Sequence, residues 1–309
     1  MKNQLLNDER GLLIDVARKF YTLDELRALI DLLAEHELTH LQLHFSDNED
    51  FRIESDWVKA SEQHYTKAEI RELLVYAQEH QIAIVPELDS PGHWGYILAQ
   101  YPQFKLTDTA MNLTAEAIDF SQKLLLEMLE LFKGCSIFHI GGDEFVDFAD
   151  LPDELVKQSQ DKFGATAQGL ETYVTYLNKL AERIAHQGLE PRVWNDGLFR
   201  KSNVLPNQQI TVTYWTNWHE EMAKVTAFEG YKLINFCDNY LYYVIGEAAG
   251  YAYPTPEKLA DWTPTLFSGG QKGENSGAYL SIWGDIPTAQ TFDEIFANLS
   301  ALLPIFMKK

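Results

Sequence analysis

The sequence predicts an α/β protein folded as a (β/α)8 barrel, the TIM-barrel architecture, with residues 1–309 forming a single catalytic domain. Eight short apolar runs alternate with longer amphipathic stretches, as in repeated strand–helix units. Several of these runs are apolar almost throughout, which is typical of parallel strands covered on both faces. No GxGxxG motif follows the first run and no GxxxxGK[ST] motif occurs, so the usual nucleotide-binding reasons for an open doubly wound sheet are missing.

The strands and helices follow one another in a regular order along the chain. The predicted strands are 12–17, 40–45, 83–88, 137–140, 191–195, 210–215, 232–236 and 278–283. The predicted helices are 22–37, 66–81, 114–134, 169–188 and 288–306, with weaker ones at 218–229 and 256–261. Thr22 with Glu25, and Thr66 with Glu69, have the spacing of a capping box, which marks a helix start. The helices at 114–134 and 169–188 each end at a glycine, a common helix stop.

Composition and charge restrict the class of partner. The formal net charge of −21 argues against nucleic acid and anionic membrane surfaces as partners, since both require a basic footprint. No segment approaches 18 consecutive apolar residues, and the N-terminus lacks a basic start followed by an apolar stretch. The two cysteines, Cys135 and Cys237, form neither a disulfide framework nor a CxxC metal pair. We therefore expect a cytoplasmic protein without a metal or other cofactor.

Chemically active side chains recur where the predicted strands end, which is where barrel enzymes place their active sites. Acids, imidazoles and indoles share this position in nearly every unit. In chain order they are Arg18, His44, Asp47, Glu87, Asp89, His93, Asp143, Glu144, Trp194, Asn195, Asp196, Trp215, Asp238, Tyr240, Tyr242, Trp283 and Asp285. Carboxylates can break glycosidic bonds, flat aromatic faces stack on sugar rings, and charged groups bind hydroxyls. The pattern indicates a sugar site.

Six motifs then point to one family. They are "LHFSDNE" (43–49), "PELDSPGH" (86–93), "FHIGGDEF" (138–145), "RVWNDG" (192–197), "TYW" (213–215) and "LSIWGD" (280–285). Together they resemble glycoside hydrolase family 20, the β-N-acetylhexosaminidases, and in particular its short single-barrel members. The motifs occur in the family's order from about residue 11 to residue 290.

The resemblance implies exo-acting, substrate-assisted hydrolysis, in which the 2-acetamido oxygen of the substrate attacks C1 and forms an oxazolinium intermediate. Glu144 would be the general acid and then the base, and Asp143 would hold the acetamido N–H. Side chains at consecutive extended positions diverge, so one carboxylate can reach the glycosidic oxygen and the other the C2 substituent. An ionised Asp143 also disfavours ionisation of Glu144, which must be protonated to act as an acid.

The resemblance extends to further residues, one by one. Asp47 and His93 would form a relay that tunes Glu144, and Arg18 would bind the O3 and O4 hydroxyls of the terminal sugar. An aromatic cage around the sugar would consist of Trp194, Trp215 and Trp283. Tyr240 would hydrogen-bond the acetamido oxygen, although Tyr242 is close enough in sequence to take that role instead. Asp285 occupies a position where the family often has a glutamate that grips O4 or O6.

Several alternatives stay open at this level. Either N-acetylglucosamine or N-acetylgalactosamine could be the terminal sugar of the oligosaccharide or glycan that serves as partner, and the oligomeric state is not fixed. The chain could instead hydrolyse poly-N-acetylglucosamine. Two more distant alternatives are a Mg²⁺-dependent barrel enzyme, with Glu87, Asp143 and Glu144 as oxygen ligands, and a non-catalytic carbohydrate-binding barrel.

Overall fold

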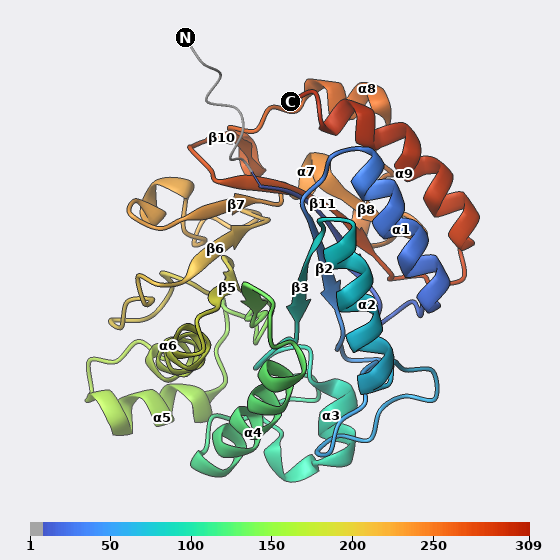
Figure 1. Cartoon of the computed structure of the whole chain (residues 1–309). Helices are drawn as coiled ribbons and strands as arrows, with labels where there is room; N and C mark the ends of the chain where they lie inside the picture. Colours follow the sequence, from blue (N-terminus) through green and yellow to red (C-terminus); the bar gives the residue numbers. More distant parts are fainter. Residues whose placement is uncertain (1–8) are drawn as a thin grey trace.

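The computed structural model describes residues 9–309 and shows a closed barrel of parallel strands surrounded by helices (Figure 1). The barrel follows the strand order β1-β2-β3-β4-β5-β6-β7-β11, and pairing of β11 with β1 closes it. The bounds are β1 Glu9–Asp15, β2 His40–His44, β3 Ala83–Glu87, β4 Ile137–His139, β5 Glu190–Trp194, β6 Thr211–Tyr214, β7 Leu233–Asn235 and β11 Gly277–Trp283. The predicted (β/α)8 fold is confirmed. Residues 1–8 of the N-terminal stretch in which the sequence shows no leader pattern lie outside the described residues.

A short strand that the sequence pattern did not predict completes the mouth of the barrel. β8, Tyr242–Val244, pairs in parallel with the last three residues of β11, so that Tyr243 lies opposite Ile282. β7 pairs with β11 only near the start of β11, where Asn235 lies opposite Ala278. Because β8 pairs with the end of β11, it brings Tyr242 beside the end of the last barrel strand. A strand of only three residues has too little periodicity to be recognised in the sequence.

Most of the predicted helices are present within a few residues of their expected bounds. They are α1 Leu23–Glu35, α2 Lys67–Glu79, α4 Ala115–Leu131, α6 Glu171–His186, α8 Pro256–Asp261 and α9 Phe292–Phe306. Shorter or unpredicted helices are α3 Gly95–Gln100, α5 Asp153–Phe163 and α7 Asp238–Leu241. Both predicted capping boxes form, with Thr22 capping α1 and Thr66 capping α2. Helix α5 buries only Leu155 and Ser159, so its sequence carries little apolar periodicity.

The helix expected at 218–229 is wrong. Only a short 3₁₀ turn, Val225–Phe228, forms there, and the residues before it run as a loop over the barrel mouth. The indole N–H of Trp218 donates to Oδ2 of Asp238 at 2.6 Å, and the Trp218 ring packs edge-on against Trp215. These two contacts hold the start of the segment across the ends of β6 and β7, in place of a helix on the outside of the barrel.

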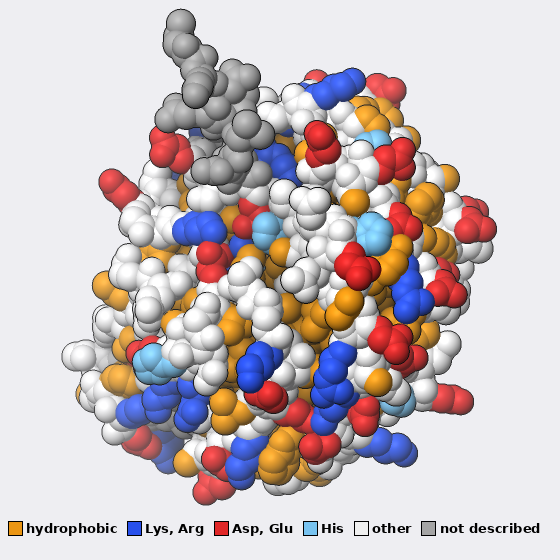
Figure 2. All heavy atoms as spheres, in the orientation of Figure 1, with side chains coloured by type: hydrophobic (Ala, Val, Ile, Leu, Met, Phe, Trp, Pro, Cys, Tyr) orange, Lys and Arg blue, Asp and Glu red, His pale blue; other side chains and the backbone are white. Residues whose placement is uncertain are grey.

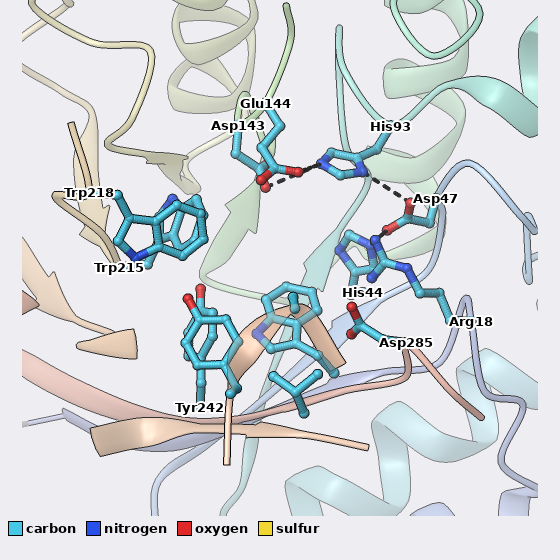
Figure 3. Close-up of a pocket in the computed structure, with 14 residues that line it drawn as sticks. Arg18, His44, Asp47, His93, Asp143, Glu144, Trp215, Trp218, Tyr242 and Asp285 are labelled. Atoms are coloured by element: carbon cyan, nitrogen blue, oxygen red, sulfur yellow. Dashed lines mark hydrogen bonds and ion pairs between the residues drawn. The ribbon is translucent and has the colours of Figure 1, made fainter. Parts of the chain in front are cut away.

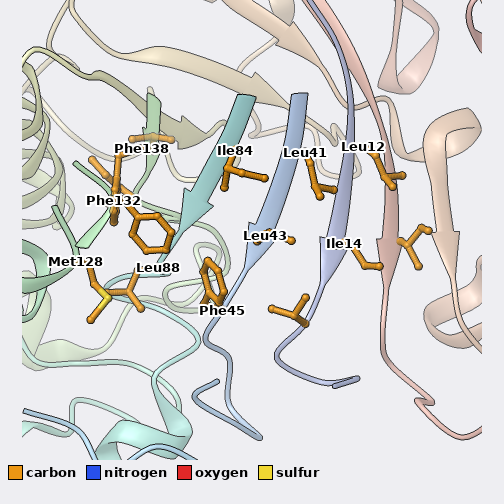
Figure 4. Close-up of a cluster of buried hydrophobic side chains, with 14 of the residues drawn as sticks. Leu12, Ile14, Leu41, Leu43, Phe45, Ile84, Leu88, Met128, Phe132 and Phe138 are labelled. Atoms are coloured by element: carbon orange, nitrogen blue, oxygen red, sulfur yellow. The ribbon is translucent and has the colours of Figure 1, made fainter. Parts of the chain in front are cut away.

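Two apolar layers lie on the two sides of the sheet. Leu12 and Ile14 of β1 point outward, with Leu41 and Leu43 of β2, into the cluster between strands and helices (Figure 4). Leu13, which lies between Leu12 and Ile14, belongs instead to the cluster inside the barrel. This alternation is the period of two expected of a strand covered on both faces. Among the residues described, no helix combines the length and apolar character needed to cross a bilayer.

A surface groove lies at the amino end of the strands. It runs between α2 and α4 near the starts of β3 and β4, and Val75, Ile82 and Leu131 line it. Acidic and basic side chains are interspersed on the face drawn in Figure 2, and hydrophobic side chains gather near its centre. The groove is at the end of the barrel opposite to the predicted site residues.

Candidate active site

A cavity opens at the carboxyl ends of the barrel strands (Figure 3). Its volume is about 550 Å³ when the solvent-open space at its mouth is included. Nine of the eleven predicted site residues line it. They are Arg18, Asp47, His93, Asp143, Glu144, Trp215, Tyr242, Trp283 and Asp285. Residues that lie more than 260 positions apart in the chain therefore meet at one end of the barrel, as the strand-end argument predicted.

The turn after β4 explains the two glycines that precede the acidic pair. Gly141 and Gly142 have φ values of +78° and +95°, a region that L side chains rarely adopt. A Cβ on Gly141 would also collide with the carboxylate of Asp89, whose Oδ1 accepts the N–H of Gly142 at 3.0 Å. Glu144 itself has a φ of +43°, and its N–H donates to Oδ2 of Asp196 at 2.9 Å. The backbone is thus held in the conformation that brings both carboxylates to the cavity.

A chain of polar contacts leads from the second strand to the acidic pair. Nδ1 of His93 lies 3.0 Å from Oδ1 of Asp47. Nε2 of the same ring lies 3.4 Å from Oδ2 of Asp143 and 3.5 Å from Oε2 of Glu144. The other carboxylate oxygen of Asp47 is 2.7 Å from Nη2 of Arg18 and 2.8 Å from Nε2 of His44. The relay expected from Asp47 and His93 is therefore within contact distance of both carboxylates.

The environment separates the pKa values of the two neighbouring carboxyl groups. Burial opposes ionisation of Asp143, but the charge of the nearby His93 outweighs it and lowers the pKa of Asp143. Desolvation raises the pKa of Glu144, and the negative charge of Asp143 adds to this rise while His93 opposes it. The carboxylates of Asp47 and Asp143 outweigh the burial of His93 and raise its pKa well above the usual value. One carboxyl group of the pair is thus favoured as an anion and the other as an acid.

Aromatic rings form the opposite wall and the floor of the cavity. The rings of Trp215 and Tyr242 are nearly parallel, at 3°, with centroids 5.9 Å apart. Trp283 lies 5.7 Å from Tyr242 and meets His44 edge-on at 5.3 Å. Flat rings at fixed angles suit the weakly apolar faces of a sugar ring.

The structure does not place two of the predicted site residues on the cavity surface. Trp194 lies beneath the floor, where its indole N–H donates to Oε1 of Glu87 at 2.8 Å and its ring is 6.2 Å from Trp283. It therefore supports Trp283 from below. Tyr240, on α7, is partly buried against the core outside the barrel, whereas Tyr242 lines the cavity. The tyrosine at the cavity is the second of the two that the sequence offered.

The sequence pattern missed two aromatic residues of the cavity, Trp218 and Tyr251. Both are held by Asp238, whose Oδ2 accepts the indole N–H of Trp218 at 2.6 Å and the hydroxyl of Tyr251 at 3.0 Å. A signal for Trp218 existed, since it follows the strand-end Trp215 by three residues in a loop. Tyr251 lies in an irregular segment without a strand end to mark it, so only the folded chain reveals its place.

Two clusters of described residues offer three metal-type ligand atoms each, namely His44 with Glu87 and Asp89, and Asp89 with His93 and Asp143. Metal ligation requires a neutral imidazole. The pKa values of His44 and His93 are both raised well above the usual value, because nearby carboxylates outweigh burial. Glu87, a ligand in the Mg²⁺ alternative, already accepts hydrogen bonds from Gln42 and Trp194 and does not line the cavity. Both imidazoles of these clusters are paired with Asp47, His44 at 2.8 Å and His93 at 3.0 Å.

The fold and the cavity together define a (β/α)8 barrel whose carboxylates and aromatic rings meet in one cavity at the carboxyl ends of the strands. The particular family follows from comparison with known sequences, since the family model described as glycosyl hydrolase family 20, catalytic domain, matches residues 9–302. The chain belongs to this family, and the resemblance seen in its motifs is confirmed.

Relatives and solved structures agree with this assignment. A lacto-N-biosidase of Bifidobacterium bifidum is 24% identical over 75% of this chain and 22% of its own length. A chitooligosaccharidolytic β-N-acetylglucosaminidase of Bombyx mori is 23% identical over 95% of this chain and 56% of its own length. The chain thus spans between about a fifth and about half of these proteins.

Among solved structures, dispersin B is 25% identical, with a TM-score of 0.78 over 98% of this chain and 99% of that one. A catalytic module of the pneumococcal exo-β-D-N-acetylglucosaminidase StrH is 24% identical, with a TM-score of 0.79 over 98% of this chain and 85% of that one. These likenesses support the barrel fold along the described chain.

Proposed function

We propose that the protein is an exo-acting β-N-acetylhexosaminidase, which releases terminal non-reducing β-linked N-acetylhexosamine from oligosaccharides through an oxazolinium intermediate. The observation that carries this proposal is the position of the acidic pair, because Asp143 and Glu144 both approach Nε2 of His93 from within a single cavity. The names of the Bombyx mori relative, a chitooligosaccharidolytic β-N-acetylglucosaminidase, and of the family members described as β-hexosaminidases support the same reaction.

The position of the pair argues for a nucleophile supplied by the substrate. In an ordinary retaining glycosidase the nucleophile and the acid flank the anomeric carbon from opposite sides, about 5–5.5 Å apart. Here the two carboxylates belong to consecutive residues and lie next to each other on one side of the cavity (Figure 3), with Oδ2 of Asp143 and Oε2 of Glu144 at 3.4 Å and 3.5 Å from the same imidazole nitrogen. Asp143 is placed to hold an acetamido N–H while Glu144 reaches the glycosidic oxygen.

The reaction then has two steps. The acetamido oxygen forms a bond to C1 as the bond from C1 to the leaving oxygen breaks, and Glu144 gives its proton to that oxygen. Glu144 next removes a proton from a water molecule, whose oxygen attacks C1, and the C1 bond to the acetamido oxygen breaks. Asp143, ionised throughout, stabilises the positive charge on the acetamido group. Tyr242 is the tyrosine placed to hydrogen-bond the acetamido oxygen in the first step.

The other side of the cavity fits the hydroxyls of a terminal sugar. The guanidinium of Arg18 is fixed by Asp15 at 2.9 Å and by Asp47 at 2.7 Å, and Asp285 lines the same end of the cavity (Figure 3). We assign Arg18 to O3 and O4, with Asp285 as a shorter replacement for the family's usual glutamate. A charged group held at two points binds hydroxyls without having to be ordered first.

The substrate can be tested directly. We expect release of the chromophore from an aryl N-acetyl-β-glucosaminide in the presence of EDTA, together with inhibition by a thiazoline analogue of the oxazolinium intermediate. Loss of turnover with EDTA would favour the Mg²⁺-dependent alternative instead. Binding of N-acetylglucosamine without any turnover would favour a non-catalytic carbohydrate-binding barrel.

A second candidate, hydrolysis of poly-N-acetylglucosamine, is favoured by one observation, the match to dispersin B over nearly the full length of both chains. A panel of β-linked N-acetylglucosamine and N-acetylgalactosamine substrates of different lengths separates the two. Preference for short oligosaccharides supports trimming, which we propose takes place in the cytoplasm, and faster cleavage of the long polymer supports the second candidate. Cell fractionation tests the location.

A further inference from the structure

A second open hollow lies next to the catalytic cavity, between the loop at 146–149 after β4 and the loop at 218–222 after β6. It measures about 960 Å³ counted to its open mouth. The cavity and the hollow have three lining residues in common, Glu144, Trp215 and Trp218. Arg18 and Asp285 line only the cavity, on the side away from Trp215 and Trp218 (Figure 3). The two spaces therefore meet at the proposed proton donor.

We infer that this hollow binds the leaving-group side of the substrate, and that the preferred substrate is a neutral β-linked oligosaccharide of three or more sugars. The inference rests on the proposed function. Glu144 must touch the oxygen that joins the terminal sugar to the rest of the chain. If the terminal sugar occupies the cavity as far as Arg18, the sugars beyond the scissile bond leave on the other side of Glu144, where the hollow begins.

Trp218 is built as a platform for the first of these sugars. Its side chain is 50% exposed, which is unusual for so large an apolar group. It is nevertheless fixed in orientation, by the hydrogen bond to Asp238 at 2.6 Å and by edge-on packing against Trp215 at 81° and 4.9 Å. A rigid, half-exposed indole loses little conformational freedom when a sugar ring stacks on it.

The wall beyond Trp218 carries the groups that a second sugar requires. Asp147 and His219 are exposed and offer hydrogen-bonding atoms for hydroxyls, while Phe148 is only 6% exposed and forms an apolar base. The guanidinium of Arg200 lies over the Phe148 ring at 4.9 Å, but Glu221 pairs with it at 3.2 Å. Because that positive charge is matched and Asp147 adds a negative one, the hollow suits neutral sugars better than acidic ones.

The test compares substrates of increasing length on the intact protein. We expect kcat/KM to rise about tenfold from the β-1,4-linked N-acetylglucosamine disaccharide to the trisaccharide, as a further sugar gains contacts beyond Trp218. A flat length series overturns the inference. If the wild-type protein does not hydrolyse the aryl N-acetyl-β-glucosaminide at all, it is the proposed function that fails, so the two failures are distinguishable.

Variants locate the effect. Asp147→Ala and His219→Ala should each lower the ratio of kcat/KM for the trisaccharide to that for the aryl glycoside by about fivefold, the effect of one lost hydrogen bond. Trp218→Ala should lower kcat/KM for both oligosaccharides by about tenfold, because it removes the stacking surface. Trp57→Ala is the matched control, an indole 40% exposed that does not line either space. Two results together would refute the assignment. Trp57→Ala and Trp218→Ala would lower kcat/KM for the oligosaccharides equally, and Asp147→Ala and His219→Ala would leave the ratio of kcat/KM for the trisaccharide to that for the aryl glycoside unchanged.

Discussion

Each end of the barrel holds an arginine that is paired with carboxylates. Strand β1 supplies a carboxylate to both networks, Glu9 at the amino end and Asp15 at the carboxyl end. At the amino end, Arg192 of β5 crosses the barrel interior to Glu9 of β1, with Nη1–Oε1 and Nη2–Oε2 distances of 2.6 Å and 2.7 Å. Tyr279 of β11 joins this pair. At the carboxyl end, Arg18 follows β1 and contacts Asp15 and Asp47.

The two networks differ in how completely their polar atoms are matched. Arg192 is fully buried, and its positive charge outweighs the effect of burial and lowers the pKa of Glu9 to about 2. At the carboxyl end, Nε2 of His93 meets two carboxylates only at 3.4 Å and 3.5 Å, and Oδ1 of Asp143 and Oδ2 of Asp89 are buried without a hydrogen-bond partner. Unmatched polar atoms in a cavity destabilise the folded chain unless a ligand meets them. The amino end is therefore organised for stability and the carboxyl end for binding.

The largest effect on activity should come from Glu144. We expect Glu144→Gln to lower kcat by about 10²–10⁴-fold, the usual contribution of a general acid and base. The melting temperature should hardly change, because the Glu144 side chain is 53% exposed. Thermal unfolding and turnover of the aryl glycoside measure both quantities. Full turnover by this variant would remove Glu144 from the mechanism.

Asp143→Asn should lower kcat by about 10²–10³-fold, since it removes a charge that stabilises the intermediate. It should also shift the pH profile. Glu144 acts in its protonated form, so kcat/KM is lost as the pH rises through the pKa of Glu144. The charge of Asp143 helps to raise that pKa, so the basic limb should move to lower pH in the variant. A limb that stays in place, or moves upward, would show that the pair is not coupled in this way.

A smaller effect is expected from the tyrosine at the cavity. Tyr242→Phe should lower kcat/KM by about 10- to 100-fold, because a hydrogen bond to the acetamido oxygen is lost at the reacting centre. Tyr240→Phe is the matched control, since Tyr240 does not line the cavity. Steady-state kinetics with one aryl glycoside compare them. A larger loss in the Tyr240 variant would restore the first sequence assignment.

At the amino end we expect the reverse pattern. Glu9→Gln should leave kcat unchanged at temperatures where the protein is folded, yet lower the free energy of unfolding by about 3 kcal/mol at pH 7, because the buried Arg192 loses its two-point partner and keeps only Glu190, at 2.9 Å. The folded pKa of Glu9 is lowered to about 2 from 4.5. Its stabilising contribution is therefore present above about pH 4.5 and is lost as the pH falls toward 2.

Urea unfolding at several pH values checks this expectation. The difference between the wild-type protein and Glu9→Gln should shrink as the pH falls through that window. A difference that is independent of pH would mean that packing, and not the ion pair, is responsible.

The sequence was most informative where chemistry is tied to strand ends. Parallel strands bring their carboxyl ends to one edge and the motifs mark those ends, so the sequence alone predicts that five residues lie together, namely Arg18, Asp47, His93, Asp143 and Glu144. The folded barrel adds how they meet, including the contact of one imidazole nitrogen with both neighbouring carboxylates.

The sequence was least informative on the aromatic side, where irregular loops build the wall. Tyr242 became the cavity tyrosine through the short strand β8, which has no period to detect. Trp194 has the residue type and strand-end position of a sugar-binding indole, yet it lies beneath the floor because its N–H is used by Glu87. Side-chain direction at a strand end depends on neighbours that are distant in sequence, and a linear pattern does not contain them.

The central claim is that the substrate's own acetamido oxygen is the nucleophile and that Asp143 and Glu144 serve it in different ways. The most direct measurement is kcat/KM for a series of aryl glucosaminides whose N-acetyl group carries zero, one, two or three fluorine atoms. Fluorine withdraws electrons from the carbonyl oxygen, so the mechanism predicts a steep, continuous fall in kcat/KM along the series. A rate that does not depend on fluorination would contradict the account, because a nucleophile supplied by the protein would not be weakened by the substitution.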